Sequence, residues 1–177
     1  MKKISLLVLM IPVLYAVQSC DDPKKAKNYN YETTVDQGGL KFIDNALDGG
    51  RTELRLSMAA ERISNNPRVV NFAKMMVTDH MKALEGLKKL GKKELVSQND
   101  GVSAAHKKII DNISKLSGVE FDKAYMQQMV TDHEKTVKLF EEGSENRDNA
   151  VQSYAGKTLP TIQMHLDSAK AIEAGLK

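Results

Sequence analysis

The chain has 177 residues, with 26 Lys and Arg against 23 Asp and Glu, one cysteine, and aromatic residues at only 5%. This near balance of charge and scarcity of rings leaves neither the basic patch nor the stacking platform that nucleic-acid binding requires, so we expect no nucleic acid partner. A single cysteine also excludes an intrachain disulfide framework and a CxxC zinc or redox motif.

Residues 1–19 have the pattern of a signal peptide. Lys2 and Lys3 precede an apolar run of 14 residues, which is too short to span a bilayer comfortably. Ser19-Cys20 follows and resembles the lipobox of bacterial lipoproteins, in which the cysteine becomes the lipidated first residue of the mature chain. The alternative is a plain secretory signal with an incidental cysteine. We therefore expect a cell-envelope lipoprotein attached to a membrane through Cys20, on an outer-membrane, periplasmic or surface face.

Residues 20–35 are polar, contain Pro23 and show no apolar period, which is typical of a tether. The remaining segment, residues 36–177, has helical apolar spacing throughout and is predicted to form one all-α domain. Long helices joined by short turns favour an antiparallel four-helix bundle with an additional short helix.

The first predicted helix covers residues 36–63 and includes Met58 on its inward face. Asn66 is expected to cap the second helix, while Pro67 fills its first position, where no amide hydrogen is needed. The apolar stripe of that helix ends at Gly91, which is a typical helix stop.

The second half of the domain contains a short helix and two long ones. Ser103 is expected to cap the short helix, which ends near Leu116. The next helix follows Gly118. A last helix spans residues 145–176, where Pro160 should either introduce a kink or begin a separate helix.

The pentapeptide Met-Val-Thr-Asp-His occurs twice, at residues 76–80 and 129–133. Within each copy the methionine and the histidine are four residues apart, so both lie on one helix face. An offset of 53 residues aligns the two copies and also other apolar positions around them. The pattern indicates an internal duplication, most simply of a helical hairpin. We expect His80 and His133 to lie within reach of each other inside the bundle.

Five groups of residues are distributed along the domain: Gly49-Gly50 with Glu53, Met76-Val77 with Asp79-His80, Leu116-Ser117-Gly118 with Phe121-Asp122 and Tyr125, Met129-Val130 with Asp132-His133, and Thr158-Leu159-Pro160 with His165-Leu166. In this combination they resemble a bacterial family, the domain of unknown function numbered 4142. The resemblance covers most of residues 36–175. It implies a ferritin-like helical bundle and an exported or envelope location, and it implies no established activity. The family more often has glutamine at position 61, whereas Glu61 here could be a ligand or could reach solvent at the end of the bundle.

The repeated motif offers a nitrogen and a sulfur ligand on each of two helices. His80 with Met76, and His133 with Met129, would suit copper(I) if the two helices are neighbours. Glu53 or His165 could complete a harder site for zinc or copper(II), and Asp79 and Asp132 are candidate partners that orient the histidines. Two other interpretations stay open: methionines and histidines that only fill the core, and a proton-linked switch.

A carboxylate-bridged di-iron site is not indicated, because such sites use Glu-x-x-His and no glutamate lies three residues before His80, His133 or His165. His106 lies in the first turn of a helix, where a surface role is expected. The leading interpretation is a non-enzymatic binding or support module of the envelope, in which the histidines are candidates to bind a metal. A ferritin-like metal-dependent enzyme or metal store, and a protein-protein interaction module, are the alternatives. The sequence identifies no protein partner.

Overall fold

The computed structural model describes residues 35–94, 96 and 101–176, so the predicted signal peptide, Cys20 and nearly all of the tether lie outside it. Five helices form: α1 (Gln37–Ile63), α2 (Pro67–Lys93), α3 (Ala104–Ile113), α4 (Gly118–Ser144) and α5 (Asn149–Glu173). No β-strand occurs among the described residues, which confirms the all-α class. None of the described helices is both long enough and apolar enough to cross a membrane.

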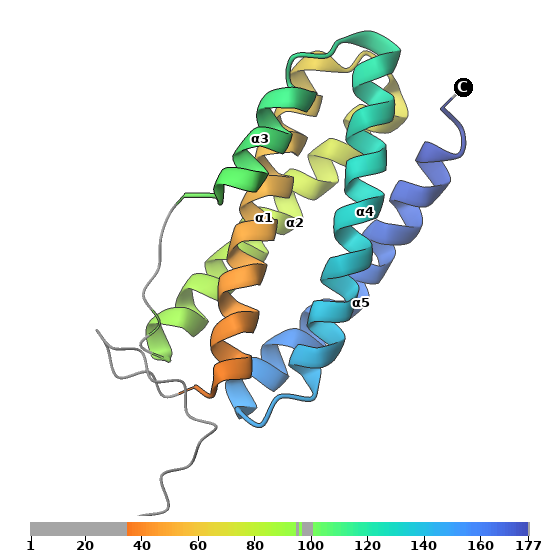
Figure 1. Ribbon diagram of the computed structural model, residues 1–177. Helices are drawn as coiled ribbons and strands as arrows, with labels where there is room; N and C mark the ends of the chain where they lie inside the picture. The colour runs from red at the N-terminus through yellow and green to blue at the C-terminus, as the bar shows by residue number, and fades with distance from the viewer. Residues whose placement is uncertain (1–34, 95, 97–100, 177) are drawn as a thin grey trace, which may run out of the picture.

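The four long helices pack as a ferritin-like bundle, and α3 lies against the outside of α1 (Figure 1). Asn146, after α4, hydrogen-bonds Asp36 at the start of α1 with 3.2 Å between the Nδ2 and Oδ1 atoms. Arg68, at the start of α2, donates to the carbonyl of Ala171 near the end of α5, with 2.8 Å between Nη2 and O. Each long helix is therefore antiparallel to both of its neighbours, and the crossover through α3 makes α2 and α4 a parallel, diagonal pair.

This arrangement corrects the expected hairpin duplication. The helix before α4 is the short outer helix α3. It is not equivalent to α1, the bundle helix that precedes α2. The repeated pentapeptide instead relates α2 to α4. Because these two helices run in the same direction, their matching residues lie at matching heights in the bundle.

The capping residues in the sequence predicted where the helices begin more accurately than where they end. The Asp36, Asn66 and Ser103 side chains accept hydrogen bonds from first-turn amides, as the sequence predicted for the last two. The ends differ: α2 continues past Gly91 to Lys93, and α3 stops at Ile113. The last helix starts at Asn149 and remains one helix through Pro160, so no separate helix begins there.

The inward face of α1 also differs from its apolar pattern. Met58, which was expected to face inward, is 47% exposed, and Glu61 is exposed as well. The buried line in the middle of the helix instead contains Glu53, Leu56 and Ser57. Ser57 is buried because its hydroxyl hydrogen-bonds the Tyr125 hydroxyl, with 2.8 Å between oxygens. Two polar side chains, Glu53 and Ser57, thus face inward where the apolar pattern predicted Met58.

Two apolar clusters fill the bundle, one toward each end. The cluster near the α4–α5 turn, called here the lower cluster, includes Phe42, Ile43, Leu87, Phe140 and Val151. The cluster near the α1–α2 turn, called the upper cluster, includes Leu56, Phe72, Met76, Tyr125 and Met129. Between the two lies a layer of buried polar side chains.

We predict opposite effects of alanine at two glycines of these helices. A Cβ at Gly143 would lie 2.6 Å from the Cδ2 and Cε2 atoms of Phe42, whose ring packs edge-on against Phe140 with centroids 4.9 Å apart and has little room to move. Gly143→Ala should lower the free energy of unfolding by about 1–3 kcal/mol in urea titrations, because overpacking forces the core apart. Gly49→Ala is the matched control: no atom lies within 4 Å of its Cβ position, and alanine should stabilise the helix by about 1 kcal/mol. Equal stability of the two variants would contradict this packing.

Candidate metal centre

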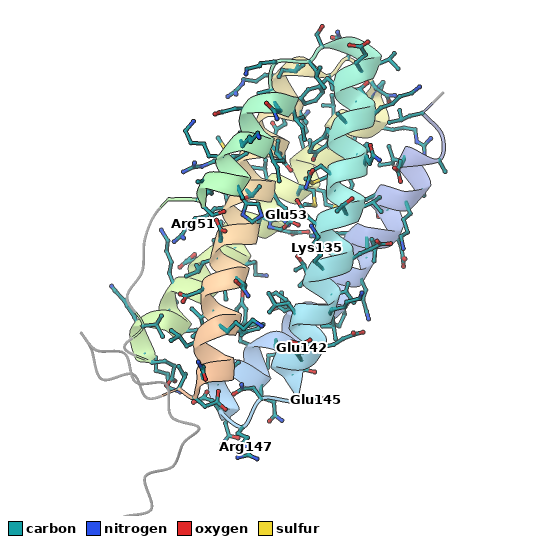
Figure 2. The ribbon with its side chains drawn as sticks, viewed as in Figure 1. Arg51, Glu53, Lys135, Glu142, Glu145 and Arg147 are labelled. Atoms are coloured by element: carbon teal, nitrogen blue, oxygen red, sulfur yellow. The ribbon has the colours of Figure 1, made fainter. Side chains whose placement is uncertain are left out.

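Four buried polar residues, one from each long helix, form the layer between the two apolar clusters. They are Glu53 of α1, His80 of α2, His133 of α4 and His165 of α5. Glu53 lies halfway up the bundle, far from Glu145 and Arg147 at its lower end (Figure 2). The side chains are almost completely enclosed: Glu53 is 1% exposed, His80 8%, His133 0% and His165 2%.

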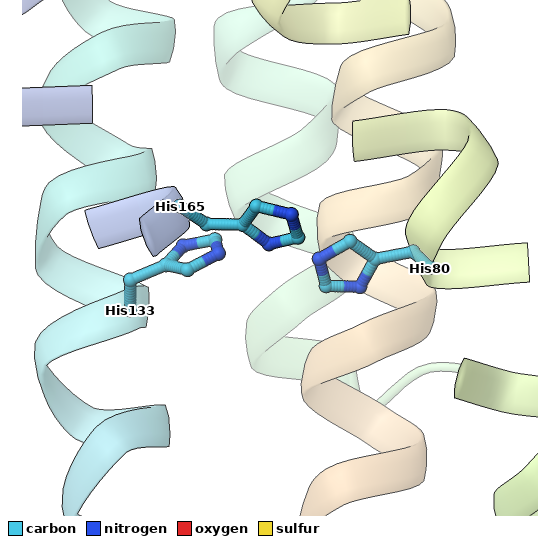
Figure 3. Close-up of side chains that lie close together, drawn as sticks. All are labelled: His80, His133 and His165. Carbon is cyan, nitrogen blue, oxygen red and sulfur yellow. The ribbon is translucent and has the colours of Figure 1, made fainter. Parts of the chain in front are cut away.

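The three histidine rings point toward one another (Figure 3). Their centroids are 5.9 Å apart for His80 and His133, 5.7 Å for His80 and His165, and 5.6 Å for His133 and His165. One nitrogen from each ring can be chosen so that all three nitrogens lie within 4.8 Å of one another. The expectation that His80 and His133 lie within reach of each other is confirmed.

Hydrogen bonds on the outer side of two rings set which nitrogen faces the cluster. The Nδ1 atom of His133 is 2.9 Å from the carbonyl oxygen of Met129, and the Nε2 atom of His165 is 2.9 Å from Oδ2 of Asp79. Both acceptors lack a proton to give, so each of these nitrogens is the N–H donor, and the other nitrogen of each ring carries the lone pair when the ring is neutral. Those atoms, Nε2 of His133 and Nδ1 of His165, are buried without a hydrogen-bond partner.

Glu53 lies beside two of the rings. Its Oε2 is 3.5 Å from Nδ1 of His80, and its Oε1 is 3.3 Å from Nδ1 of His133. These distances allow electrostatic attraction, but neither oxygen has an aligned hydrogen bond. Burial raises the pKa of the Glu53 carboxyl well above its usual range, and the nearby Asp132 carboxylate raises it further.

Two histidines of the layer, His80 and His133, are held in their neutral form. Burial lowers the pKa of His80 to about 3, with further lowering by His133 and His165. Burial likewise lowers the pKa of His133 to about 4, with a further contribution from His165. At neutral pH both rings therefore offer lone pairs, which is the state in which imidazole binds a metal.

A cavity of about 410 Å³ reaches the layer from the side of the lower cluster. All four residues of the layer line it, and its other walls are mostly apolar. Exposed lining residues on three helices, Asn45, Lys82 and Lys157, mark where it meets solvent. The polar layer is thus closed on the side of the upper cluster and accessible on the other.

The two methionines and two aspartates that the sequence offered as candidates lie outside the layer of four polar residues. Met76 and Met129 are buried in the upper cluster and do not line the cavity. Asp79, a candidate partner for orienting the histidines, contacts His165 of another helix. Asp132 accepts a hydrogen bond from Gln128 of its own helix, with 2.8 Å between Oδ2 and Nε2.

Two residues outside the layer behave as surface groups. Glu61 is exposed, so its carboxylate reaches solvent rather than the cluster. His106 is half-buried on α3, where its Nδ1 lies 2.8 Å from Oδ2 of Asp48 on α1. The backbone amide of Ser103 also donates to Oδ1 of Asp48 at 2.8 Å. His106 therefore helps to attach α3 to the bundle, in agreement with its expected surface role.

Sequence reasoning underestimated His165 and the partnership of Glu53 with two histidines. His165 lies outside the repeated pentapeptide, and the sequence offered it only as an alternative to Glu53 for completing a site built on the two repeats. A usable signal was present: four polar residues, Glu53, His80, His133 and His165, each fall within a few residues of the middle of a long helix.

Glu53→Gln should change how the stability of the metal-free protein depends on pH. In the unfolded chain the Glu53 carboxyl ionises near its ordinary pKa of 4.5, whereas the folded protein keeps the proton to higher pH. The folded state then binds more protons, so this group lowers the free energy of unfolding as pH rises from about 4.5 through the raised pKa. Urea titrations in a chelator should show the Gln variant gaining stability relative to wild type over that interval. Glu61→Gln, an exposed site on the same helix, should track wild type; parallel curves for Glu53→Gln would contradict the prediction.

Comparison with known proteins places the chain in a family. A search of curated proteins gives no match. Among solved structures, the chain is similar to a DUF305 fragment from Deinococcus radiodurans, with a TM-score of 0.70 and 13% identity over 80% of this chain and 99% of that one. A DUF305 protein from Streptomyces coelicolor, assigned as secreted, gives a TM-score of 0.66 and 11% identity over 78% of this chain and 91% of that one.

At these identities the structural likeness establishes the helical fold alone. The family model for a domain of unknown function, DUF4142, matches residues 25–172, which is most of the chain. The chain therefore belongs to the DUF4142 family.

Proposed function

We propose that this protein is a non-enzymatic metal-binding module of the cell envelope, and that His80, His133 and His165 together hold one zinc or copper(II) ion. The observation that carries the proposal is the pair of buried, unpartnered lone pairs on Nε2 of His133 and Nδ1 of His165. Each such atom costs about 1–3 kcal/mol when left unsatisfied, and a metal ion would satisfy both at once.

The hydrogen bonds behind the rings support this function. Metal-bound histidines commonly donate their second N–H to a carbonyl or carboxylate, which fixes the tautomer and the ring orientation. Met129 and Asp79 provide these acceptors for His133 and His165. Glu53 would act behind His80 and His133, where its carboxylate offsets part of the charge of the ion.

The donor set favours zinc or copper(II) over the alternatives. Three imidazole nitrogens suit both ions, whereas copper(I) would be favoured by thioethers, and neither Met76 nor Met129 lines the cavity. A di-iron centre needs several carboxylates, and the layer supplies one. Zinc–nitrogen bonds of about 2.0–2.1 Å place tetrahedral ligands about 3.3 Å apart. The rings would therefore draw together around the ion by side-chain rotation.

Metal titration tests the proposal. The purified domain, residues 36–177, should bind one zinc(II) or copper(II) ion per chain with a dissociation constant below about 1 μM, because the neutral rings are already assembled. His80→Ala combined with His133→Ala should abolish that binding while circular dichroism shows the helices intact. His106→Ala is the matched control, since it removes a histidine outside the layer, and it should bind metal as wild type does. If wild type binds neither ion more tightly than this limit, or if the double variant binds equally well, the metal proposal is wrong.

We also propose that a lipid on Cys20 holds the domain at the membrane. The proposal is supported by the apolar segment ending at Ser19-Cys20 and by the polar residues 20–35 that follow. Two or more acyl chains are enough for stable anchoring without a spanning helix.

Cys20→Ser should move the protein from the membrane fraction to the soluble fraction or leave it unprocessed, and it should abolish labelling by a fatty-acid analogue in growing cells. Cys20 is the only cysteine, so labelling in the wild type reports on this site alone. Labelling that persists in the serine variant would exclude lipidation at Cys20.

A further inference from the structure

We propose that the cavity beside the histidine layer binds a small organic anion, a monocarboxylate with an apolar body, whose carboxylate occupies the open position of the bound metal ion. This inference rests on the proposed metal function and names the class of ligand that the site takes. It follows from three features of the cavity: its contact with the layer, its apolar walls and the charges that line it.

The first feature is an open coordination position. Three histidines supply three ligands, and the Glu53 oxygens lie near Nδ1 of His80 and Nδ1 of His133, not at the unpartnered Nε2 of His133. A tetrahedral ion would therefore keep one position for an external ligand, as sites with three protein ligands do. His80, His133 and His165 all line the cavity, so that position faces its interior.

The second feature is the apolar lining below the layer. Leu84 and Leu87 of α2, Phe140 of α4 and Ile162 of α5 form the inner walls. The lining extends from His165 to Tyr154 along α5, which is about 16 Å of helix at 1.5 Å per residue. A volume of about 410 Å³ lies within the range of small-molecule sites, roughly 300–1,000 Å³. An extended chain of eight carbons is shorter than this lining stretch of α5.

The third feature is the charge of the lining. The charged side chains that line the cavity are Glu53, Asp79, Lys82 and Lys157. Glu53 and Asp79 face histidines of the layer, whereas Lys82 and Lys157 are exposed on α2 and α5. A bound divalent cation makes the lining positive overall, and the lysines lie where an anion would enter. Positive charge around a narrow opening raises the rate at which anions bind.

Calorimetric titration with sodium octanoate tests the inference. Zinc-loaded protein should bind octanoate at least about tenfold more tightly than acetate, because the apolar body is buried. It should bind octan-1-ol far more weakly, because the alcohol lacks the carboxylate. Metal-free protein should lose most of the octanoate affinity.

Variants locate the ligand. Lys82→Glu with Lys157→Glu should weaken octanoate binding several-fold at low salt, while Lys74→Glu with Lys123→Glu, two exposed lysines away from the cavity, should leave it unchanged. Ala83→Phe, which places a ring in the cavity wall, should reduce octanoate binding without lowering the zinc content.

The zinc content of each sample separates the two possible failures. Protein that holds one zinc ion per chain and binds no octanoate overturns this inference and leaves the metal function in place. Octanoate that binds equally well with and without zinc overturns the assigned coordination. Protein that fails to take up zinc overturns both proposals.

Discussion

Three imidazoles and one carboxyl in the middle of an apolar bundle form the constraint on which the rest of the structure depends. Buried polar groups destabilise the fold where partners are lacking, because an unsatisfied one costs about 1–3 kcal/mol. The chain supplies some partners itself, through the Met129 carbonyl and the Asp79 carboxylate. It leaves the inner lone pairs of His133 and His165 without one. The four long helices must keep their relative heights for the layer to form at all.

The crossover through α3 makes that alignment possible with a repeated motif. Since α2 and α4 run in the same direction, each pentapeptide places its histidine in the layer and its methionine one turn away, toward the upper cluster. An antiparallel pair would have sent the two methionines to opposite ends. The contacts of Asp48 with His106 and Ser103 attach the start of α3 to α1, and so hold the crossover on the outside of the bundle.

The two sides of the layer are built differently, and this difference gives the site its chemical character. Above it, Tyr125 stacks on Phe121 with ring centroids 5.9 Å apart, and methionines fill the space around these rings. Below it, small residues such as Ala46, Gly50 and Ala83 line a cavity that reaches solvent. The upper cluster therefore holds the rings in place, while the lower side gives access to them. An ion held by the layer would therefore be reachable by small molecules from the lower side.

Much of the architecture could be predicted from the sequence, because it depends on local chemistry. Apolar spacing identified the helices, Asn66-Pro67 and Ser103 fixed two helix starts, and the repeated pentapeptide brought His80 and His133 together. Helix ends at Gly91 and near Leu116 were misplaced, because tertiary packing can extend or shorten a helix by a turn without a strong local stop.

Only the tertiary structure decided which polar residues face inward. Spacing alone assigned Met58 to the core, whereas the structure exposes Met58 and buries His165 in the layer. The physical reason is that His165 can be buried because a partner from another helix reaches it: Asp79, which lies 86 residues away in sequence. The sequence by itself thus determined the helices, their caps and the paired histidines. The crossover, the choice of diagonal partners and the cavity beside the layer depended on contacts between distant segments, which no local pattern records.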